Sequence, residues 1–153
     1  MKVTDIIRKE YIVEGLKSKS KRDVLAELSG VFLQGGVKYS HEEMVKTLLE
    51  REKLGSTGIG DGIAIPHGKL ANLEELIVSF GRSKEGVEFD AMDGKPAHIF
   101  FLLMAPEDTT GKHLKALAKI SKMLKDSTFR KKLLEAKSKD ELYGIITEKD
   151  DSC

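Results

Sequence analysis

The chain has 153 residues, of which 40% are hydrophobic and 33% charged, and we expect residues 1–153 to form a single globular domain. Its 26 basic and 25 acidic residues leave a net charge of +1, which argues against a general nucleic-acid-binding protein, because such domains carry a strong basic excess. The sequence has no signal-peptide core and no apolar run near the roughly 20 residues of a membrane span, and its single cysteine, Cys153, fits a reducing compartment, so we expect a cytoplasmic protein.

The first third of the chain is predicted to hold one short element and two capped helices. Residues 1–19 are weakly patterned and are expected to pack as a short helix or strand. Ser20 caps a helix that ends at the glycine pair 35–36, and Ser40 caps a second helix, because a serine three residues before an acidic residue marks a helix start. Arg51 then lies in the last turn of the second helix, next to the loop that follows.

The middle of the chain is predicted to supply the strands. A glycine-rich loop over residues 55–62 leads into an apolar strand over residues 63–66, and further strands are expected over residues 74–81, 87–89 and 98–104. The last of these is apolar nearly throughout, which is typical of a strand at the centre of a sheet that is covered on both faces.

Three helices are predicted after the strands. Thr109 or Thr110 caps the first, Ser127 begins the second, and Ser138 caps the third. Helices before and after a block of strands indicate the α/β class, with a mixed β-sheet flanked by helices on both faces, an α/β sandwich.

The glycine-rich loop is the first candidate for chemistry. Glycines at positions 55, 58, 60 and 62 let main-chain N–H groups approach an anion closely, although the same spacing also fits a flexible connector. The loop is not a nucleotide P-loop, which needs Gly-Lys-Ser/Thr at the start of a helix, and not a dinucleotide fingerprint, which follows a strand and opens a helix.

His67 is the second candidate. It follows the predicted strand over residues 63–66 and stands between Pro66, which fixes a backbone torsion, and Gly68, which leaves room beside the ring. Because imidazole titrates near neutral pH, a useful fraction of it is uncharged at pH 7, and its nitrogen can attack phosphorus. The alternative is a structural histidine with a satisfied hydrogen bond.

His113 is the third candidate, in the first turn of a predicted helix. It shares a face with Leu117, Ile120 and Leu124 and is therefore expected to point inward. The positive end of the helix dipole favours a neutral imidazole there and attracts anions, and a core histidine is the alternative.

Metal and hydrolase chemistry receive little support. The four histidines show neither His-Glu-x-x-His nor paired-cysteine spacing, so no metal site is expected, and the chain lacks a Gly-x-Ser-x-Gly elbow. His41 lies at a capped helix start and His98 enters a strand, and we expect both to be structural.

The sequence around His67 also resembles a known family. Residues 51–69, with the glycine-rich loop and Pro-His-Gly, look like the active-site signature of the IIA domains of the bacterial phosphoenolpyruvate:sugar phosphotransferase system (PTS), in the fructose/mannitol and nitrogen-regulatory (type 2) group. Residues 89–96, 100–106 and 113–118 agree as well, so the resemblance covers nearly the whole chain.

The resemblance implies that His67 accepts a phosphoryl group from the phosphohistidine of the carrier protein HPr, and that Arg51 and His113 line the site. Arg51 would supply a permanently charged fork for phosphate oxygens, and His113 would donate one hydrogen bond while remaining neutral. The protein would be a phosphotransferase component that needs no cofactor, because the donor is already a high-energy phosphohistidine. Ser56, Thr57 and Asp93 are weaker candidates.

The role of the phosphoryl group stays open between alternatives. In the main interpretation His67 passes it to a IIB component for sugar uptake, and the membrane enters only through a IIC permease. In the alternative, a nitrogen-type regulatory protein, the phosphorylation state of His67 controls binding to partner proteins; a phosphate-binding domain without turnover is a third. Residues 111–149 hold 11 Lys/Arg and 5 Asp/Glu, which fits either a solvated helix face or a docking face for an acidic partner.

Overall fold

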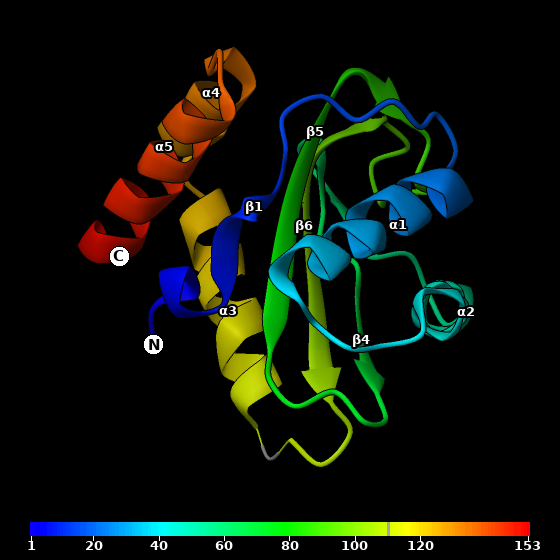
Figure 1. Ribbon diagram of the computed structural model, residues 1–153. Coiled ribbons are helices and arrows are strands. Elements are labelled where there is room, and N and C mark those ends of the chain that lie inside the picture. The colour runs from blue at the N-terminus through cyan, green and yellow to red at the C-terminus, as the bar shows by residue number, and fades with distance from the viewer. Residues whose placement is uncertain (110) are drawn as a thin grey trace.

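Six strands form one mixed sheet in the computed structural model, which describes residues 1–109 and 111–153 (Figure 1). The strands run in the order β1-β5-β6-β3-β2, and β4 also pairs with β6. β5 and β6 are antiparallel, as are β2 and β3, whereas β1 is parallel to β5 and both β3 and β4 are parallel to β6. The bounds are Ile7–Val13 (β1), Gly58–Gly60 (β2), Ile63–Ala64 (β3), His67–Leu70 (β4), Ile77–Val87 (β5) and Ala97–Pro106 (β6).

Helices cover both faces of this sheet. Figure 1 shows α1 and α2 on one side of the strands and α3, α4 and α5 on the other. The α-helices are α1 (Lys21–Gly30), α2 (His41–Lys53), α3 (Lys112–Leu124), α4 (Ser127–Glu135) and α5 (Lys139–Ser152), and short 3-10 helices span Val3–Asp5 and Val31–Gly35. The predicted α/β sandwich is therefore confirmed.

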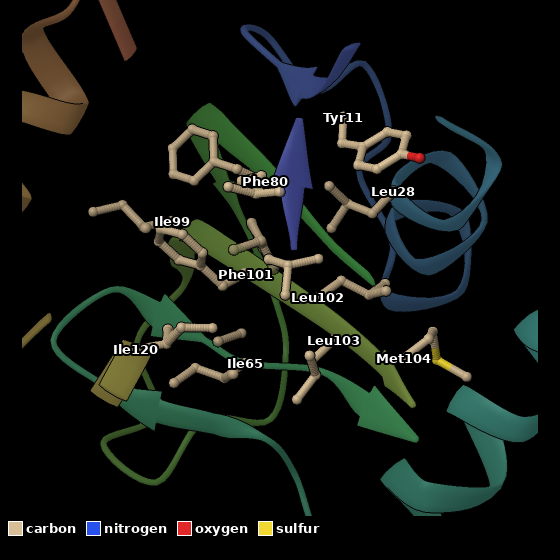
Figure 2. Close-up of a cluster of buried hydrophobic side chains, with 14 of the residues drawn as sticks. Tyr11, Leu28, Ile65, Phe80, Ile99, Phe101, Leu102, Leu103, Met104 and Ile120 are labelled. Carbon is tan, nitrogen blue, oxygen red and sulfur yellow. The ribbon is translucent and has the colours of Figure 1, made fainter. Parts of the chain in front are cut away.

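β6 is the central strand, as its apolar sequence predicts. β5 pairs with one of its edges, and β3 and β4 follow one another along the other edge. Its side chains are buried on both faces, and Figure 2 shows them within the apolar cluster. The Phe101 ring meets Phe80 edge-on at 5.0 Å between centroids, and Phe100 meets Phe89 at 5.5 Å. Each such buried side chain contributes roughly 1.5–3 kcal/mol of hydrophobic stabilisation, which fixes β6 firmly.

Three helix starts are the ones that the capping pattern predicts. In each case a serine side chain accepts a hydrogen bond from the main-chain N–H three residues later, which satisfies a donor that the helix itself leaves unpaired. The pairs are Ser20 with Asp23 (3.2 Å), Ser40 with Glu43 (3.2 Å) and Ser138 with Glu141 (3.0 Å).

Two predicted boundaries are wrong. The first helix does not continue to the glycine pair 35–36, because α1 ends at Gly30 and tightens into the 3-10 helix that Gly36 closes with a φ of 76°. The strands expected over residues 74–81 and 87–89 are one strand, β5, whose pairing with β6 shifts register between Arg82 and Val87. A bulge inserted into one strand looks like a break in the sequence pattern.

The start of α3 also differs from the prediction. Gly111 occupies the N-cap position with a φ of 83°, a conformation that glycine adopts without strain. Thr109 is therefore not the cap, and Thr110, the other predicted cap, lies outside the described residues. Since glycine has no side chain, its position gives the first turn of α3 no capping oxygen.

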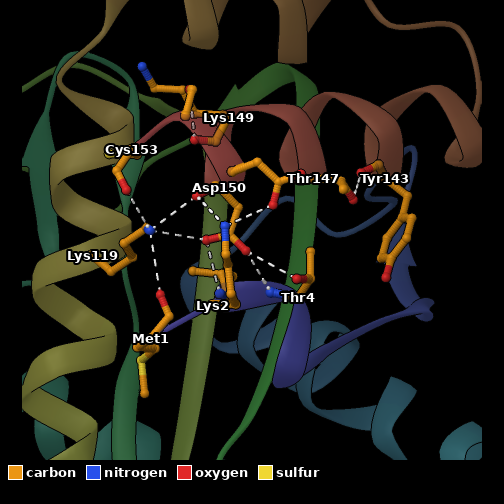
Figure 3. Close-up of polar contacts among 12 residues, drawn as sticks. Met1, Lys2, Thr4, Lys119, Tyr143, Thr147, Lys149, Asp150 and Cys153 are labelled. Atoms are coloured by element: carbon orange, nitrogen blue, oxygen red, sulfur yellow. Dashed lines mark hydrogen bonds and ion pairs between the residues drawn. The ribbon is translucent and has the colours of Figure 1, made fainter.

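A buried carboxylate joins the two ends of the chain (Figure 3). Asp150 in α5 is fully buried and accepts hydrogen bonds from the main-chain N–H groups of Val3 (3.0 Å) and Thr4 (3.1 Å) and from the Thr4 hydroxyl. The ammonium group of Lys119 in α3 lies 3.4 Å from the same carboxylate and donates to the main-chain carbonyl of Cys153 at 3.0 Å. This cluster fixes α5 and the N-terminal turn against α3.

Within the described ranges, no helix combines the length and the apolar character that crossing a membrane requires.

Candidate functional site

His67, Arg51 and His113 line one cavity of about 530 Å³. α2 contributes Arg51 from its last turn, β4 contributes His67 and the first turn of α3 contributes His113. The complete lining is Thr47, Glu50, Arg51, Leu54, His67, Gly68, Lys69, Leu103, His113 and Leu117. A larger groove of about 870 Å³ lies along α1 and α2, but its lining contains no histidine, cysteine, serine or threonine to act as a nucleophile. The smaller cavity is therefore the candidate site.

His67 follows a strand, as predicted, but that strand, β3, ends at Ala64 instead of residue 66, and His67 itself begins the next strand, β4. β3 and β4 keep the same register against β6, with Ala64 opposite Phe100 and His67 opposite Leu103. Pro66 has no N–H to donate, so the pairing lapses beside it and resumes at His67. The pairing of β4 with β6, which begins directly after Pro66, therefore fixes the backbone of His67.

Glycine at position 68 lets α2 pack close to His67. A Cβ atom there would lie 3.2 Å from the Thr47 methyl group in α2 and 3.6 Å from the Met104 methyl group in β6. The first distance is tighter than normal contact and the second is ordinary, so a side chain at this position would require Thr47 to shift by a few tenths of an ångström. Arg51 lies on the same helix as Thr47, so Gly68 lets the helix that carries Arg51 pack closely beside His67.

The ring of His67 has a defined orientation. Its Nδ1 lies 2.8 Å from the main-chain carbonyl oxygen of Ile65. A carbonyl oxygen only accepts, so Nδ1 carries the proton in this hydrogen bond, and Nε2 of the neutral ring keeps its lone pair. A neutral ring in this tautomer presents one nucleophilic nitrogen, Nε2.

Arg51 is held against the start of the glycine-rich loop. Its Nη1 donates a hydrogen bond of 2.8 Å to the main-chain carbonyl of Gly55. Within residues 1–109 and 111–153, no carboxylate lies within ion-pair distance of its guanidinium. The rest of the fork is thus available to an anion in the cavity.

His113 is half-buried, and its Nδ1 is buried without a hydrogen-bond partner in the described part of the chain. Burial, followed by the charges of Lys69 and His67, lowers the pKa of His113. The lowered pKa favours the neutral imidazole at pH 7. A buried polar atom without a partner costs free energy.

The cavity favours anions. Its charged lining consists of Arg51, Lys69 and Glu50, so cationic groups outnumber the acidic one. Close to low-dielectric walls such an excess of positive charge concentrates anionic ligands.

The two remaining histidines are structural, as predicted. Nε2 of His41 lies 2.8 Å from the main-chain carbonyl of Ala26 and 3.1 Å from the Ser29 hydroxyl. Nδ1 of His98 lies 2.9 Å from the main-chain carbonyl of Ser83. Among the side chains that the structure describes, no three of the His, Cys, Asp or Glu type gather as metal ligands would.

Ser56 and Asp93 hold the backbone around the glycine-rich loop. The Ser56 hydroxyl donates to the carbonyl of Phe89 at 2.5 Å. The Asp93 carboxylate accepts from the N–H groups of Asp61 (3.1 Å) and Lys95 (3.0 Å), and the bond from Lys95 is the main reason that the pKa of Asp93 is lowered. Both side chains join the loop to the segment before β6 and do not line the cavity.

Glu52 is a residue that the sequence reasoning missed. It is 8% exposed and accepts hydrogen bonds from both the N–H and the hydroxyl of Thr57. The signal for its burial was present, because Glu52 lies four residues after Leu48 on the apolar stripe of α2.

The family model for the phosphoenolpyruvate-dependent sugar phosphotransferase system, EIIA 2, matches residues 5–149. The chain belongs to this family. The resemblance seen in residues 51–69 is therefore confirmed, and the match spans all six strands and most of α5.

Relatives of two kinds are similar to this EIIA chain. The nitrogen regulatory protein of Bradyrhizobium diazoefficiens is 40% identical over 148 residues, which cover 95% of each protein. The PTS system fructose-specific EIIABC component of Bacillus subtilis is also 40% identical, over 150 residues, and the chain spans only 24% of that protein. The crystal structure of nitrogen regulatory protein IIA-Ntr from Neisseria meningitidis has a TM-score of 0.87 at 36% identity and covers 95% of this chain and 99% of that one. Membership therefore joins the chain to both the sugar and the nitrogen branches.

Proposed function

We propose that the protein accepts a phosphoryl group from the phosphohistidine of HPr on Nε2 of His67 and passes it on. The observation that carries this proposal is the hydrogen bond from His67 Nδ1 to the Ile65 carbonyl, which leaves Nε2 as the unprotonated nitrogen of a ring that lines an anion-attracting cavity. The family match supports phosphoryl chemistry at this site.

The proposed transfer is a displacement at phosphorus. The lone pair of Nε2 forms the new N–P bond while the N–P bond of the donor phosphohistidine breaks. The donor ring carries a proton on its other nitrogen, so the electron pair of the broken bond returns to it and it leaves as neutral imidazole. Positive charge develops on the accepting ring as the bond forms. The Ile65 carbonyl, which accepts from Nδ1–H at 2.8 Å, stabilises that charge and holds the ring in place.

Arg51 and His113 stabilise the transferred group. The guanidinium of Arg51 pairs with phosphoryl oxygens through its remaining N–H groups. The imidazole of His113, which lines the same cavity, can donate one hydrogen bond to a phosphoryl oxygen in its neutral form. A single hydrogen bond from a neutral group holds the phosphoryl group less tightly than an ion pair, which suits a carrier that must also release it.

The first candidate for the acceptor is a IIB component that leads to sugar uptake. It is supported by the fructose-specific relative, whose name joins A, B and C units in one protein and which is 40% identical to this chain. In this role the protein is a phosphotransferase component.

The second candidate is a regulatory protein of the nitrogen type. It is supported by the end-to-end match to the Bradyrhizobium protein and by the TM-score of 0.87 to the Neisseria IIA-Ntr structure. In this role the charge placed on His67 switches the binding of partner proteins.

Phosphotransfer in a purified mixture tests the shared proposal. Phosphoenolpyruvate, enzyme I, HPr and this protein are combined, and acid-labile phosphate is located by mass spectrometry. We expect the wild type and His41→Gln to be labelled, since His41 binds the Ala26 carbonyl outside the cavity, and His67→Ala to remain unlabelled. Normal labelling of His67→Ala would refute the assignment. Adding a purified IIB then separates the two roles, because loss of label to IIB supports transport and retention supports regulation.

A further inference from the structure

Glu52 is a buried carboxylate with a full set of donors. Its side chain is 4% exposed, and Lys21 of α1 places its ammonium 3.1 Å from Oε1. The N–H of Thr57 donates to Oε1 at 3.2 Å, and the Thr57 hydroxyl donates to Oε2. Glu52 therefore ties α1, α2 and the glycine-rich loop together at one point.

The contacts continue from Thr57 to the histidine. The main-chain carbonyl of Thr57, which is itself buried, accepts from the N–H of Ile65 at 3.0 Å. The carbonyl of Ile65 accepts in turn from Nδ1 of His67 at 2.8 Å. Glu52, Thr57, Ile65 and His67 are thus joined by consecutive hydrogen bonds.

The loop is held from two adjacent residues of the same helix turn. Arg51 binds the carbonyl of Gly55, and Glu52 binds Thr57 two residues further on. A displacement of the loop would therefore change the position of the Arg51 fork and of the Ile65 carbonyl together.

Stability alone does not account for the buried charge of Glu52. A buried ion pair returns little net free energy, because desolvation of the two charges offsets their attraction. The ammonium of Lys21 also lies 3.2 Å from Asp90 and 4.7 Å from the centroid of the Phe89 ring. A carboxylate that is held on every side fixes one loop conformation, and that conformation orients the ring of His67.

We propose that Glu52 is a positioning residue for phosphoryl acceptance, acting through Thr57 and Ile65 to hold His67 in the tautomer with a free Nε2. This rests on the function proposed above. Weakening the contact between Glu52 and Thr57 makes the position of the Ile65 carbonyl less fixed. The Nδ1–H tautomer of His67 is then less populated, and phosphoryl transfer slows.

The matched pair Thr57→Val and Thr57→Ser tests the proposal with minimal change of shape. Valine removes the hydroxyl and keeps the N–H donor to Glu52, whereas serine keeps both. We expect Thr57→Val to accept phosphate about tenfold more slowly than the wild type. This is the smaller effect seen when a residue that hydrogen-bonds to a metal-binding side chain is lost. Thr57→Ser should stay within about twofold of the wild type. Glu52→Gln should slow acceptance further, and if it does not fold, the threonine pair decides.

Nitrogen-15 NMR of the unphosphorylated His67 ring supplies a readout that needs no phosphotransfer. We expect the Nδ1–H tautomer to dominate in the wild type and in Thr57→Ser, and to lose population in Thr57→Val. Asp90→Asn is the control, because Asp90 is an exposed partner of Lys21 outside the chain of contacts to His67, and it should match the wild type.

An unchanged tautomer population in Thr57→Val would overturn the positioning role, whatever the rate. A wild type that shows this tautomer but is not labelled by HPr would instead refute the proposed function and leave the structural link intact. The two failures are therefore distinguishable.

Discussion

Two histidines in one cavity have different surroundings, and the difference suggests their roles. Nδ1 of His67 has a main-chain acceptor at 2.8 Å, whereas Nδ1 of His113 is buried with no partner in the described structure. A ring held by one nitrogen offers the other as a nucleophile, and a neutral imidazole in the same cavity can donate one hydrogen bond to a ligand. The contacts therefore favour His67 as the acceptor and His113 as the donor to a phosphoryl oxygen.

The pKa of His113 should respond to phosphorylation of its neighbour. Burial and the charges of Lys69 and His67 lower this pKa below its usual value near 6.5 in the free protein. A dianionic phosphoryl group on His67 would favour the protonated ring, so the pKa should rise. Proton NMR titration of both forms measures the change, with His41 as the internal reference. An identical His113 pKa in the two forms would place His113 away from the phosphoryl group.

The lowered pKa of His113 also has a consequence for stability. The unfolded chain binds the proton more readily than the folded chain, so the free energy of unfolding should decline as pH falls through about 6.5 toward the folded pKa. This part of the pH dependence belongs to His113 and should be absent in His113→Gln.

Secondary-structure elements follow local chemistry where that chemistry is self-contained. The serine caps at positions 20, 40 and 138 were predictable because each cap needs only a residue three positions away. Gly111 as the N-cap of α3 was not, since its left-handed backbone depends on how the chain leaves β6. The single strand β5 was missed because the bulge is set by its pairing with β6.

The hydrogen-bonded cluster around Asp150, which joins α5, α3 and the N-terminal turn, should contribute measurably to the free energy of unfolding. Asp150→Ala leaves the main-chain N–H groups of Val3 and Thr4 without their acceptor and removes the charge that faces Lys119, so we expect the free energy of unfolding to fall by about 3 kcal/mol in urea at pH 7. Asp151→Ala, which removes only an exposed pair with Lys2, should change it by less than about 1 kcal/mol. Equal effects of the two variants would show that the Asp150 cluster is not stabilising.

The Asp150 cluster should lose its stabilising effect in acid. Burial acts to raise the pKa of Asp150, but hydrogen bonds from Val3, Thr4 and Lys119 outweigh it, and the pKa lies below its usual value near 3.8. A lowered pKa means stability that is present above about pH 3.8 and is lost as pH falls further through the folded pKa. The difference between wild type and Asp150→Ala should therefore shrink in that range.

At the scale of the whole molecule, the fold gathers residues that the sequence keeps apart. Arg51, His67 and His113 come from α2, β4 and α3, and no spacing rule relates them. The sequence could place each on its element, and only the family resemblance put them in one site. The support by Glu52 was hidden because it depends on Thr57 and Lys21, which lie on a different loop and a different helix.

The central claim is that Nε2 of His67 carries the phosphoryl group. The most direct measurement is nitrogen-15 NMR of the protein after phosphorylation by phosphoenolpyruvate, enzyme I and HPr. We predict one phosphorylated ring, His67, with phosphorus bonded to Nε2 and the Nδ1–H signal retained, as the bond to the Ile65 carbonyl requires. Phosphorus on Nδ1 of His67, on another histidine or on no histidine would contradict this account.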